Sequence, residues 1–476
     1  MTPPYKILCY IQREVPMFKR FIGDRAFYRR ALMVAIPIII QNGITNFVSL
    51  LDNVMVGQVG TVPMSGVAIV NNLIFVFNMC IFGATSGAGI FTAQFHGSQD
   101  HEGVRSTFRY KILISFLLSA LGCTLFYFGG KGLAMLYLKG EPDASLVEAT
   151  LEHGLGYLRI MLIGLLPFGL SYSYSSTLRE TGNGTVPMVA SITAVIVNLG
   201  LNYVLIFGHF GAPALGIRGA AIATVIARYV ELAIVAFWTH THPERNPFIR
   251  GALRSMYIPR KLFGSITLKG MPLLVNEFFW ATGMAFLNQC FSTRGLEVVA
   301  AFTITTTLSN ISNIAFMAMG NAVGIIMGQM LGAQASREEI WDANRKLMAL
   351  SVASCFIFGG AMASVSGVFP LLYNTSDSVR SIATVLICIT AGIMPFNAYT
   401  TASYFTLRSG GKSLVTFLFD SCFVWVVIVP IAFCCSRFTA MPIIPLYLLT
   451  QCADLIKCAL GYWMIKRGDW IQNLVA

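Results

Sequence analysis

Ionisable side chains lie within apolar stretches at a few positions, and these residues are the first candidates for chemistry. Asp52 follows about twenty mostly apolar residues that begin at Ala31. Glu277 lies eight residues past Lys269, which is about 12 Å along a helix. Asp420 lies at a similar depth in a later apolar stretch. A charge in hydrocarbon costs roughly 2.5–3.5 kcal/mol on insertion scales, so each carboxylate is a candidate for binding a cation, a proton or a substrate.

Two asparagines offer a partner for Asp52. Asn198 and Asn202 are one helical turn apart and therefore share a face. An amide can bind Na⁺ through its oxygen or hydrogen-bond a neutral carboxyl group, but it cannot carry a proton. If their helix lies beside that of Asp52, the three residues form a cation-coupling site with one titratable group, which could take Na⁺. The alternative is that Asp52 is a helix end wetted by interfacial water.

Two further pairs of ionisable residues are spaced for neutralisation on their own helices. Arg228 with Glu231, and Asp454 with Lys457, are three residues apart. We interpret both as structural pairs. Whether Asp420 and Asp454 line a cavity or only make structural hydrogen bonds is open from the sequence.

Apolar stretches long enough to cross a membrane must position these residues. The chain has 476 residues, of which 55% are hydrophobic and 11% charged, and its mean hydropathy is +0.68. A helix needs about 20 apolar residues to cross a bilayer. We predict an all-α integral membrane protein with twelve transmembrane helices, at residues 31–54, 64–93, 109–129, 151–176, 186–208, 217–239, 267–291, 298–327, 347–368, 379–405, 413–435 and 443–465.

Basic residues predict how the chain is oriented. With both termini inside, the inner segments carry roughly 24 Lys and Arg and the outer ones roughly 6. The net charge of +12 then reflects orientation and attraction to anionic lipid headgroups, and we expect no nucleic-acid partner. No cleaved signal peptide is expected, and the protein is predicted to lie in the inner (plasma) membrane.

The twelve helices divide into two lobes. The predicted segments are a cytoplasmic N-terminal segment (1–30), an N-lobe (31–239), a cytoplasmic loop (240–266), a C-lobe (267–465) and a cytoplasmic tail (466–476).

An internal repeat underlies this division. "AIPIIIQN" (35–42) is similar to "GMPLLVNE" (270–277), and "TAQFHG" (92–97) to "MGQMLG" (327–332). A single gap-free register aligns four pairs: Pro37 with Pro272, Gly60 with Gly295, Gln94 with Gln329, and Gly97 with Gly332. Six helices per unit return the chain to its starting side, so the repeat is parallel. A parallel repeat places a cavity between two bundles, as in transporters.

Prolines inside the predicted helices free backbone carbonyls and favour bending. Two pairs are related by the repeat, Pro37 with Pro272 and Pro167 with Pro395. We predict hinges at these four positions.

No cofactor or catalytic motif appears. The eleven cysteines show no C-x-x-C spacing, so we expect neither disulfides nor a metal centre of protein ligands. "SGGKS" (409–413) lacks the first glycine of a phosphate-binding loop. No HExxH or GxSxG pattern occurs, and the chain is not expected to be an enzyme.

Several of these segments together resemble the multidrug and toxic compound extrusion (MATE) family. The resemblance is carried by P-x-x-x-Q-N (37–42), "DNVMVGQVG" (52–60), "GATSGAG" (83–89), "MGNAVG" (319–324), and the paired "LRETG" (178–182) and "LRSGGK" (407–412). It implies a V-shaped cavity between the lobes. It also implies export of organic, often cationic, compounds in exchange for H⁺ or Na⁺.

The resemblance assigns roles to individual residues. It implies that Asp52 responds to the coupling ion and that Glu277 binds substrate or a proton. Asn202 and Asn397 stand where some members of the family have acidic residues, so this chain has fewer proton carriers. Glu277 corresponds to Asn42 in the first repeat, and this asymmetry favours a functional role for the carboxylate.

We therefore expect an antiporter that exports cationic, amphipathic small molecules. It would contact membrane lipids, act as a monomer and need no cofactor, with H⁺ or Na⁺ as the coupling ion. The alternative in the same architecture is a flippase for a lipid-linked substrate. A flippase would favour a cationic cavity, whereas the cavity candidates in the sequence are net acidic.

Overall fold

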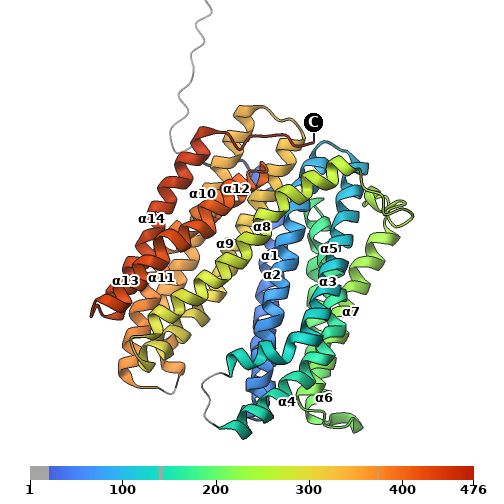
Figure 1. Ribbon diagram of the computed structural model, residues 1–476. Helices are drawn as coiled ribbons and strands as arrows, with labels where there is room; N and C mark the ends of the chain where they lie inside the picture. Colours follow the sequence, from blue (N-terminus) through green and yellow to red (C-terminus); the bar gives the residue numbers. More distant parts are fainter. Residues whose placement is uncertain (1–20, 139–142, 374, 476) are drawn as a thin grey trace, which may run out of the picture.

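The computed structural model describes residues 21–138, 143–373 and 375–475. Residues 1–20 of the predicted N-terminal segment lie outside these ranges. The described chain is helical and contains no strand in those ranges. Its helices form two bundles that meet at one end and separate toward the other (Figure 1).

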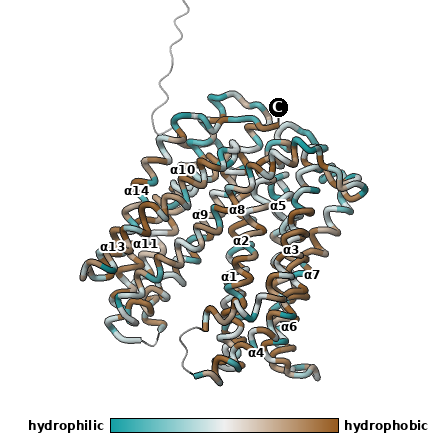
Figure 2. The backbone as a smooth tube through the Cα atoms, in the orientation of Figure 1, coloured by the Kyte–Doolittle hydropathy of each residue, from teal (hydrophilic) through white to brown (hydrophobic). Residues whose placement is uncertain are grey.

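Each bundle is built from consecutive helices. The first contains α1 (Arg25–Gly57), α2 (Thr61–Gly97), α3 (His101–Tyr137), α4 (Ala144–Met161), α5 (Leu165–Glu180), α6 (Thr185–Phe207) and α7 (Ile217–Thr241). The second contains α8 (Arg260–Ser292), α9 (Leu296–Gly332), α10 (Arg337–Ser364), α11 (Asp377–Ser409), α12 (Ser413–Phe417), α13 (Val429–Phe438) and α14 (Ile443–Arg467). The backbone is apolar along the length of the helices, and polar residues gather in the connections (Figure 2).

Eleven helices in the described ranges are long and apolar enough to cross a membrane, when α4 with α5 and α12 with α13 are each taken as one. The twelfth predicted span lies in α8, which has 33 residues and is about 50 Å long. Its apolar stretch is weakened by Asn276 and Glu277, the second of which is expected to be functional. The predicted all-helical membrane fold is confirmed.

Two transmembrane segments are interrupted near a proline. A 3₁₀ turn at Leu162–Gly164 separates α4 from α5, and Pro167 follows in the first turn of α5. Between α12 and α13 the backbone is π-helical at Leu418–Cys422 and Val424–Ile428, just before Pro430. Proline has no N–H and its ring clashes with the carbonyl four residues earlier, which disturbs the regular α-helical hydrogen bonding in the turn before it. Pro37, Pro272 and Pro395 instead lie inside continuous helices.

Polar caps in the connections define where several helices begin. The Asp24 carboxylate accepts from the N–H of Phe27 at the start of α1, and Asp100 does the same for Gly103 in α3. Ser336 and Glu339 form a reciprocal capping box at α10. Such caps satisfy N–H groups that have no partner inside the helix.

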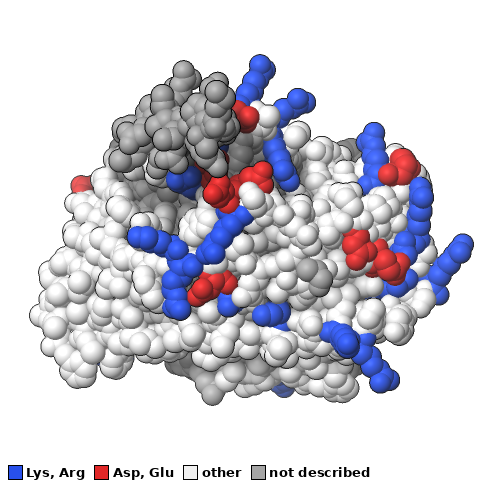
Figure 3. All heavy atoms as spheres, turned by 90° about the horizontal axis from the view of Figure 1, so that it is seen from above, with Lys and Arg blue, Asp and Glu red and all other residues white. Residues whose placement is uncertain are grey.

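The connection between the bundles is fixed by a buried arginine of α3. Arg109 donates to the carbonyl oxygens of Ala252 (2.9 Å), Gly251 (3.1 Å) and Tyr257 (3.1 Å). These residues belong to the segment between α7 and α8. Lys and Arg side chains are abundant on this face of the molecule (Figure 3).

The two bundles cross at glycines related by the repeat. A Cβ atom at Gly97 would overlap the backbone oxygen of Gln329, and one at Gly332 would overlap that of Gln94. Only glycine permits backbones to approach this closely. The ends of α2 and α9 are therefore in direct contact.

Two glutamines at this crossing bind the opposite lobe. Gln94 Nε2 donates to the carbonyl of Ser409 (2.9 Å), and Gln329 Nε2 donates to that of Glu180 (2.8 Å). Glu180 and Ser409 occupy the same place in the paired "LRETG" and "LRSGG" segments. The lobes are thus joined by two equivalent hydrogen bonds.

The last described residues also join the lobes. Residues 468–475 leave α14 of the second lobe, where the Trp470 side chain is fully buried. Gln94 of the first lobe donates to the carbonyl of Gln472 (3.2 Å) and accepts from the N–H of Leu474 (2.7 Å). This part of the predicted tail is packed against both lobes.

Gly332→Val tests the crossing. The new side chain would overlap the backbone of Gln94, and overpacking of this kind costs about 1–3 kcal/mol. We expect a lower thermal unfolding midpoint in detergent. Gly264→Ala is the control, because no atom lies within 4 Å of a Cβ there. Equal midpoints for both variants would show that the crossing accommodates a side chain.

Candidate functional site

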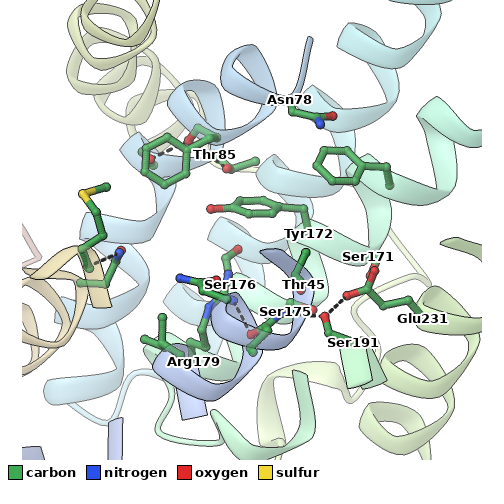
Figure 4. Close-up of a pocket in the computed structure, with 18 of the residues that line it drawn as sticks. Thr45, Asn78, Thr85, Ser171, Tyr172, Ser175, Ser176, Arg179, Ser191 and Glu231 are labelled. Carbon is green, nitrogen blue, oxygen red and sulfur yellow. Dashed lines mark hydrogen bonds between the residues drawn. The ribbon is translucent and has the colours of Figure 1, made fainter. Parts of the chain in front are cut away.

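A cavity of about 680 Å³ lies between the lobes. Most of its lining comes from α1, α2, α5, α6 and α7, and the rest from α9 and α11. The lining includes three aromatic side chains of the first lobe, Phe82, Phe168 and Tyr172. Figure 4 shows the side chains that surround this cavity.

The predicted residues Asp52, Asn198 and Asn202 meet in three dimensions. Asn202 Nδ2 donates to Asp52 Oδ1 at 2.7 Å. With the Asn198 amide oriented to suit its neighbours, its nitrogen donates to Asp52 Oδ2 at 3.0 Å, and its oxygen accepts from the N–H of Thr224 at 3.2 Å. Asp52 and Asn198 line the cavity, and Asn202 is buried behind them.

One oxygen of this group has no donor. Asn202 Oδ1 is buried and without a hydrogen-bond partner in the described residues. A buried amide oxygen beside a carboxylate is the kind of ligand that hard cations prefer. In the observed arrangement the amide nitrogens of Asn198 and Asn202 face the carboxylate, and Asn202 Oδ1 is left available as an acceptor or ligand.

A second polar group on the cavity wall was not predicted. Arg179 donates to Gln41 Oε1 (3.3 Å), Gln41 Nε2 donates to Ser191 (2.7 Å), and the Ser191 hydroxyl donates to Glu231 in a short hydrogen bond. The four residues come from α5, α1, α6 and α7. Figure 4 shows Arg179, Ser191 and Glu231 beside the cavity. We call this chain of hydrogen bonds the N-lobe relay.

The predicted Arg228–Glu231 pair makes no direct contact, although each charge acts on the other electrostatically. Arg228 donates to the carbonyl of Gly164 (3.1 Å) and stacks over the Phe168 ring at 5.1 Å from its centroid. No salt bridge joins Arg228 to Glu231 in the described ranges. The two side chains are three residues apart on α7, yet each finds its partner on another helix.

The expectation of a net acidic cavity is wrong. The lining contains equal numbers of acidic and guanidinium side chains: Asp52, Glu180 and Glu231 against Arg179, Arg228 and Arg408. Glu180 is further neutralised by the buried Lys111. Arg179 and Arg408 stack over the rings of Tyr172 and Phe82, respectively. The protein's own cations thus occupy part of the aromatic surface.

Asp420 is held in the second lobe by a buried ion pair. Lys457 Nζ of α14 lies 2.6 Å from Asp420 Oδ1, and Asn276 Nδ2 donates to Asp420 Oδ2 at 3.1 Å. In the predicted Asp454–Lys457 pair, Lys457 makes its direct salt bridge with Asp420 of a neighbouring helix and acts on Asp454 only electrostatically. Neither Asp420 nor Asp454 lines the large cavity.

Glu277 lies between the lobes, outside the lining of the large cavity. Its Oε1 accepts from the Tyr404 hydroxyl at 3.4 Å, and its Cγ lies 3.3 Å from where a Cβ of Gly83 in α2 would be. Asn397 is half-buried on α11 and does not line the cavity. The structure therefore does not bring Asn397 to the same cavity as Asp52.

The predicted prolines stand close to residues that the sequence analysis missed. Pro37 precedes Gln41 by four residues on α1, and Pro272 precedes Asn276 by four on α8. The repeat pairs Gln41 with Asn276. An amide four residues after each repeat-related proline is the sequence signal that could have identified both residues as partners of buried polar side chains.

Comparisons with known proteins agree with this architecture. The MatE family model matches residues 37–204 and 272–434, one segment in each lobe. "Probable multidrug resistance protein NorM" of Thermotoga maritima is 22% identical over 455 residues, covering 94% of each chain. "Probable multidrug resistance protein YoeA" of Bacillus subtilis is 24% identical over 460 residues, covering 94% of this chain and 96% of that protein.

Solved structures share the fold. "Outward-facing conformation of a multidrug resistance MATE family transporter of the MOP superfamily" superposes with a TM-score of 0.84 and 17% identity, covering 96% of this chain and 99% of that one. "Crystal structure of MATE in complex with MaL6" gives 0.83 and 17%, with the same coverage. With a family model that matches both lobes over more than half of the sequence, the chain belongs to the MatE family of multidrug transporters.

Proposed function

We propose that this chain is a secondary active antiporter. It exports organic, cationic and amphipathic compounds in exchange for H⁺ or Na⁺, by alternating access of its two lobes. The observation that carries the proposal is the Asp52 carboxylate, which faces the inter-lobe cavity with two amides and, among the described residues, no basic side chain in hydrogen-bond contact.

The coupling step follows from the hydration of Asp52. While the cavity is open, water stabilises the ionised carboxylate. When the lobes close over it, water leaves, and the uncompensated charge becomes costly in its new surroundings. Bound Na⁺ or a proton removes that cost. Asn202 Oδ1 and the Asp52 carboxylate would hold Na⁺, whereas the carboxylate alone would hold a proton.

The contacts between the lobes suit a reversible switch. The Gln94 and Gln329 side chains bind the opposite lobe through backbone carbonyls, and both bonds belong to equivalent parts of the repeat. Both bonds must break or shift when the lobes move relative to each other. A parallel repeat permits the lobes to rock about the central cavity.

The membrane orientation is part of the proposal. The face where the lobes meet is rich in Lys and Arg (Figure 3). Positive residues favour the cytoplasmic side. The cavity would then open away from the cytoplasm in this conformation. This is the state of an exporter after it has released its substrate outside.

A flippase for a lipid-linked substrate is the second candidate. The guanidinium groups of Arg179, Arg228 and Arg408 at the cavity favour it, since arginine binds phosphate well. Arg228 already binds Gly164 and stacks on Phe168, which leaves two candidates for a phosphate. Competition of a lipid pyrophosphate with a fluorescent cation for the purified protein would distinguish the two functions.

Asp52→Asn tests the coupling site. The substitution mimics the protonated carboxylate, so we expect folded protein that no longer responds to the coupling gradient. The measurement is export of a fluorescent cation from proteoliposomes under an imposed pH gradient and, separately, a Na⁺ gradient. Asp143→Asn is the control, because Asp143 is an exposed helix cap and Asn caps equally well. Concentrative export with unchanged ion dependence would remove Asp52 from coupling.

Glu277→Gln tests the carboxylate between the lobes. It removes a charge while keeping the shape of the side chain and its hydrogen bond with Tyr404. We expect export of several cations to fall at least roughly tenfold, the equivalent of about 1.4 kcal/mol. The exposed Glu152→Gln of α4 is the matched control. Wild-type export by the Glu277 variant would make that residue structural.

A further inference from the structure

The repeat relates three polar positions in each lobe. Helices α1 and α8 both have 33 residues, and Gln41 and Asn276 stand at the same position counted from their first residues. Helices α7 and α14 both have 25 residues, and the same count pairs Glu231 with Lys457. Ser191 and Asp420 lie equally far along the chain from the paired "LRETG" and "LRSGG" segments, so these two residues also correspond.

Both lobes use these positions for a chain of polar contacts. In the N-lobe, Gln41 donates to Ser191 and Ser191 donates to Glu231. In the C-lobe, Asn276 and Lys457 both donate to Asp420. We call the second set the C-lobe relay. The equivalent helices of each lobe are thus linked by an amide, a central oxygen and a charged side chain.

The direction of the N-lobe relay is fixed by Arg179. A guanidinium group only donates hydrogen bonds, so Gln41 must present its oxygen to Arg179 and its nitrogen to Ser191. The Ser191 hydroxyl then donates to Glu231. Every donor of the N-lobe relay therefore points toward the Glu231 carboxylate.

The relays differ in how their carboxylate is balanced. In the C-lobe, the Lys457 ammonium lies 2.6 Å from Asp420, so the chain supplies its own cation. In the N-lobe, Glu231 forms no salt bridge with any Lys or Arg of the described ranges. Arg228 is bound to Gly164, and Arg179 reaches Glu231 only through two intervening side chains. Within the part of the chain that the structure describes, the N-lobe relay therefore ends in a carboxylate that lines the cavity and has no salt bridge of its own.

We propose that Glu231 binds the protonated amine of a transported compound. The ammonium group of the compound would donate hydrogen bonds to the Glu231 carboxylate, as the Lys457 ammonium donates to Asp420 in the C-lobe relay. The apolar part of the compound would lie along the aromatic lining, which includes Phe168 and Tyr172. This inference rests on the proposed export function and assigns its substrate site to a residue other than Asp52.

Two fluorescent probes distinguish the contribution of the ammonium charge to binding from the contribution of the rest of the ligand. Dansylcadaverine carries a primary ammonium, and its N-acetyl derivative has nearly the same shape without the charge. Binding is measured by fluorescence anisotropy of the protein in nanodiscs with no ion gradient. Coupling therefore does not enter the result: loss of gradient-driven export in an otherwise normal binder would count against the antiporter proposal alone.

Glu231→Gln is the decisive variant. We expect its dissociation constant for dansylcadaverine to rise at least roughly tenfold, as for loss of a charged hydrogen bond. Binding of the acetylated probe should stay at the wild-type value. Glu152→Gln, the same change at an exposed position of the same lobe, should alter neither. Unchanged dansylcadaverine binding by Glu231→Gln, or an equal loss for both probes, would overturn the proposal.

Glu231→Asp covers the case in which Glu231→Gln does not fold. It keeps the charge and withdraws the carboxylate by one methylene from the cavity. We expect weaker binding of dansylcadaverine and wild-type binding of the acetylated probe. Wild-type affinity for both probes would contradict the assignment.

Discussion

Every polar group placed in hydrocarbon must find its partner within the protein, because no water is available to replace that partner. This constraint determines how the charged side chains are arranged. Lys111 binds Glu180, Lys457 binds Asp420, and Arg228 binds a backbone carbonyl. Once these groups are satisfied, two carboxylates of the described chain line the cavity without a salt bridge, Asp52 and Glu231. The positions available for a transported ion or compound are those that the fold has left without a direct ionic partner.

The sequence predicted the helices well because hydropathy is a property of each segment alone. It also predicted the group around Asp52, since the spacing of Asn198 and Asn202 on one helix face limits where their amides can point. The partners of Lys457 and Glu231 were missed. Both predictions relied on the nearest charge along the same helix, whereas the observed partners lie on other helices and depend on the packing of the bundle. The cavity's balanced charge was missed for the same reason.

The two lobes show how a repeat can keep its backbone and change its chemistry. Helices α1 and α8 have equal length, as do α7 and α14, so equivalent positions remain comparable. Within that frame, Ser191 is replaced by Asp420 and Glu231 by Lys457. In the C-lobe version the cation contacts the carboxylate directly, whereas in the N-lobe version Arg179 is separated from Glu231 by Gln41 and Ser191. The same three positions therefore hold a direct ion pair in one lobe and a longer chain of hydrogen bonds in the other.

The segment at residues 468–475 connects the two lobes on the face where they meet. It leaves the last helix of one lobe and is hydrogen-bonded to α2 of the other. Eight residues span at most about 26–29 Å when fully extended. The segment is therefore a tether whose extended length limits the distance between the two points that it connects. If its attachment to Gln94 persists during transport, the amplitude of the motion on this face is set by a stretch of chain outside the transmembrane helices.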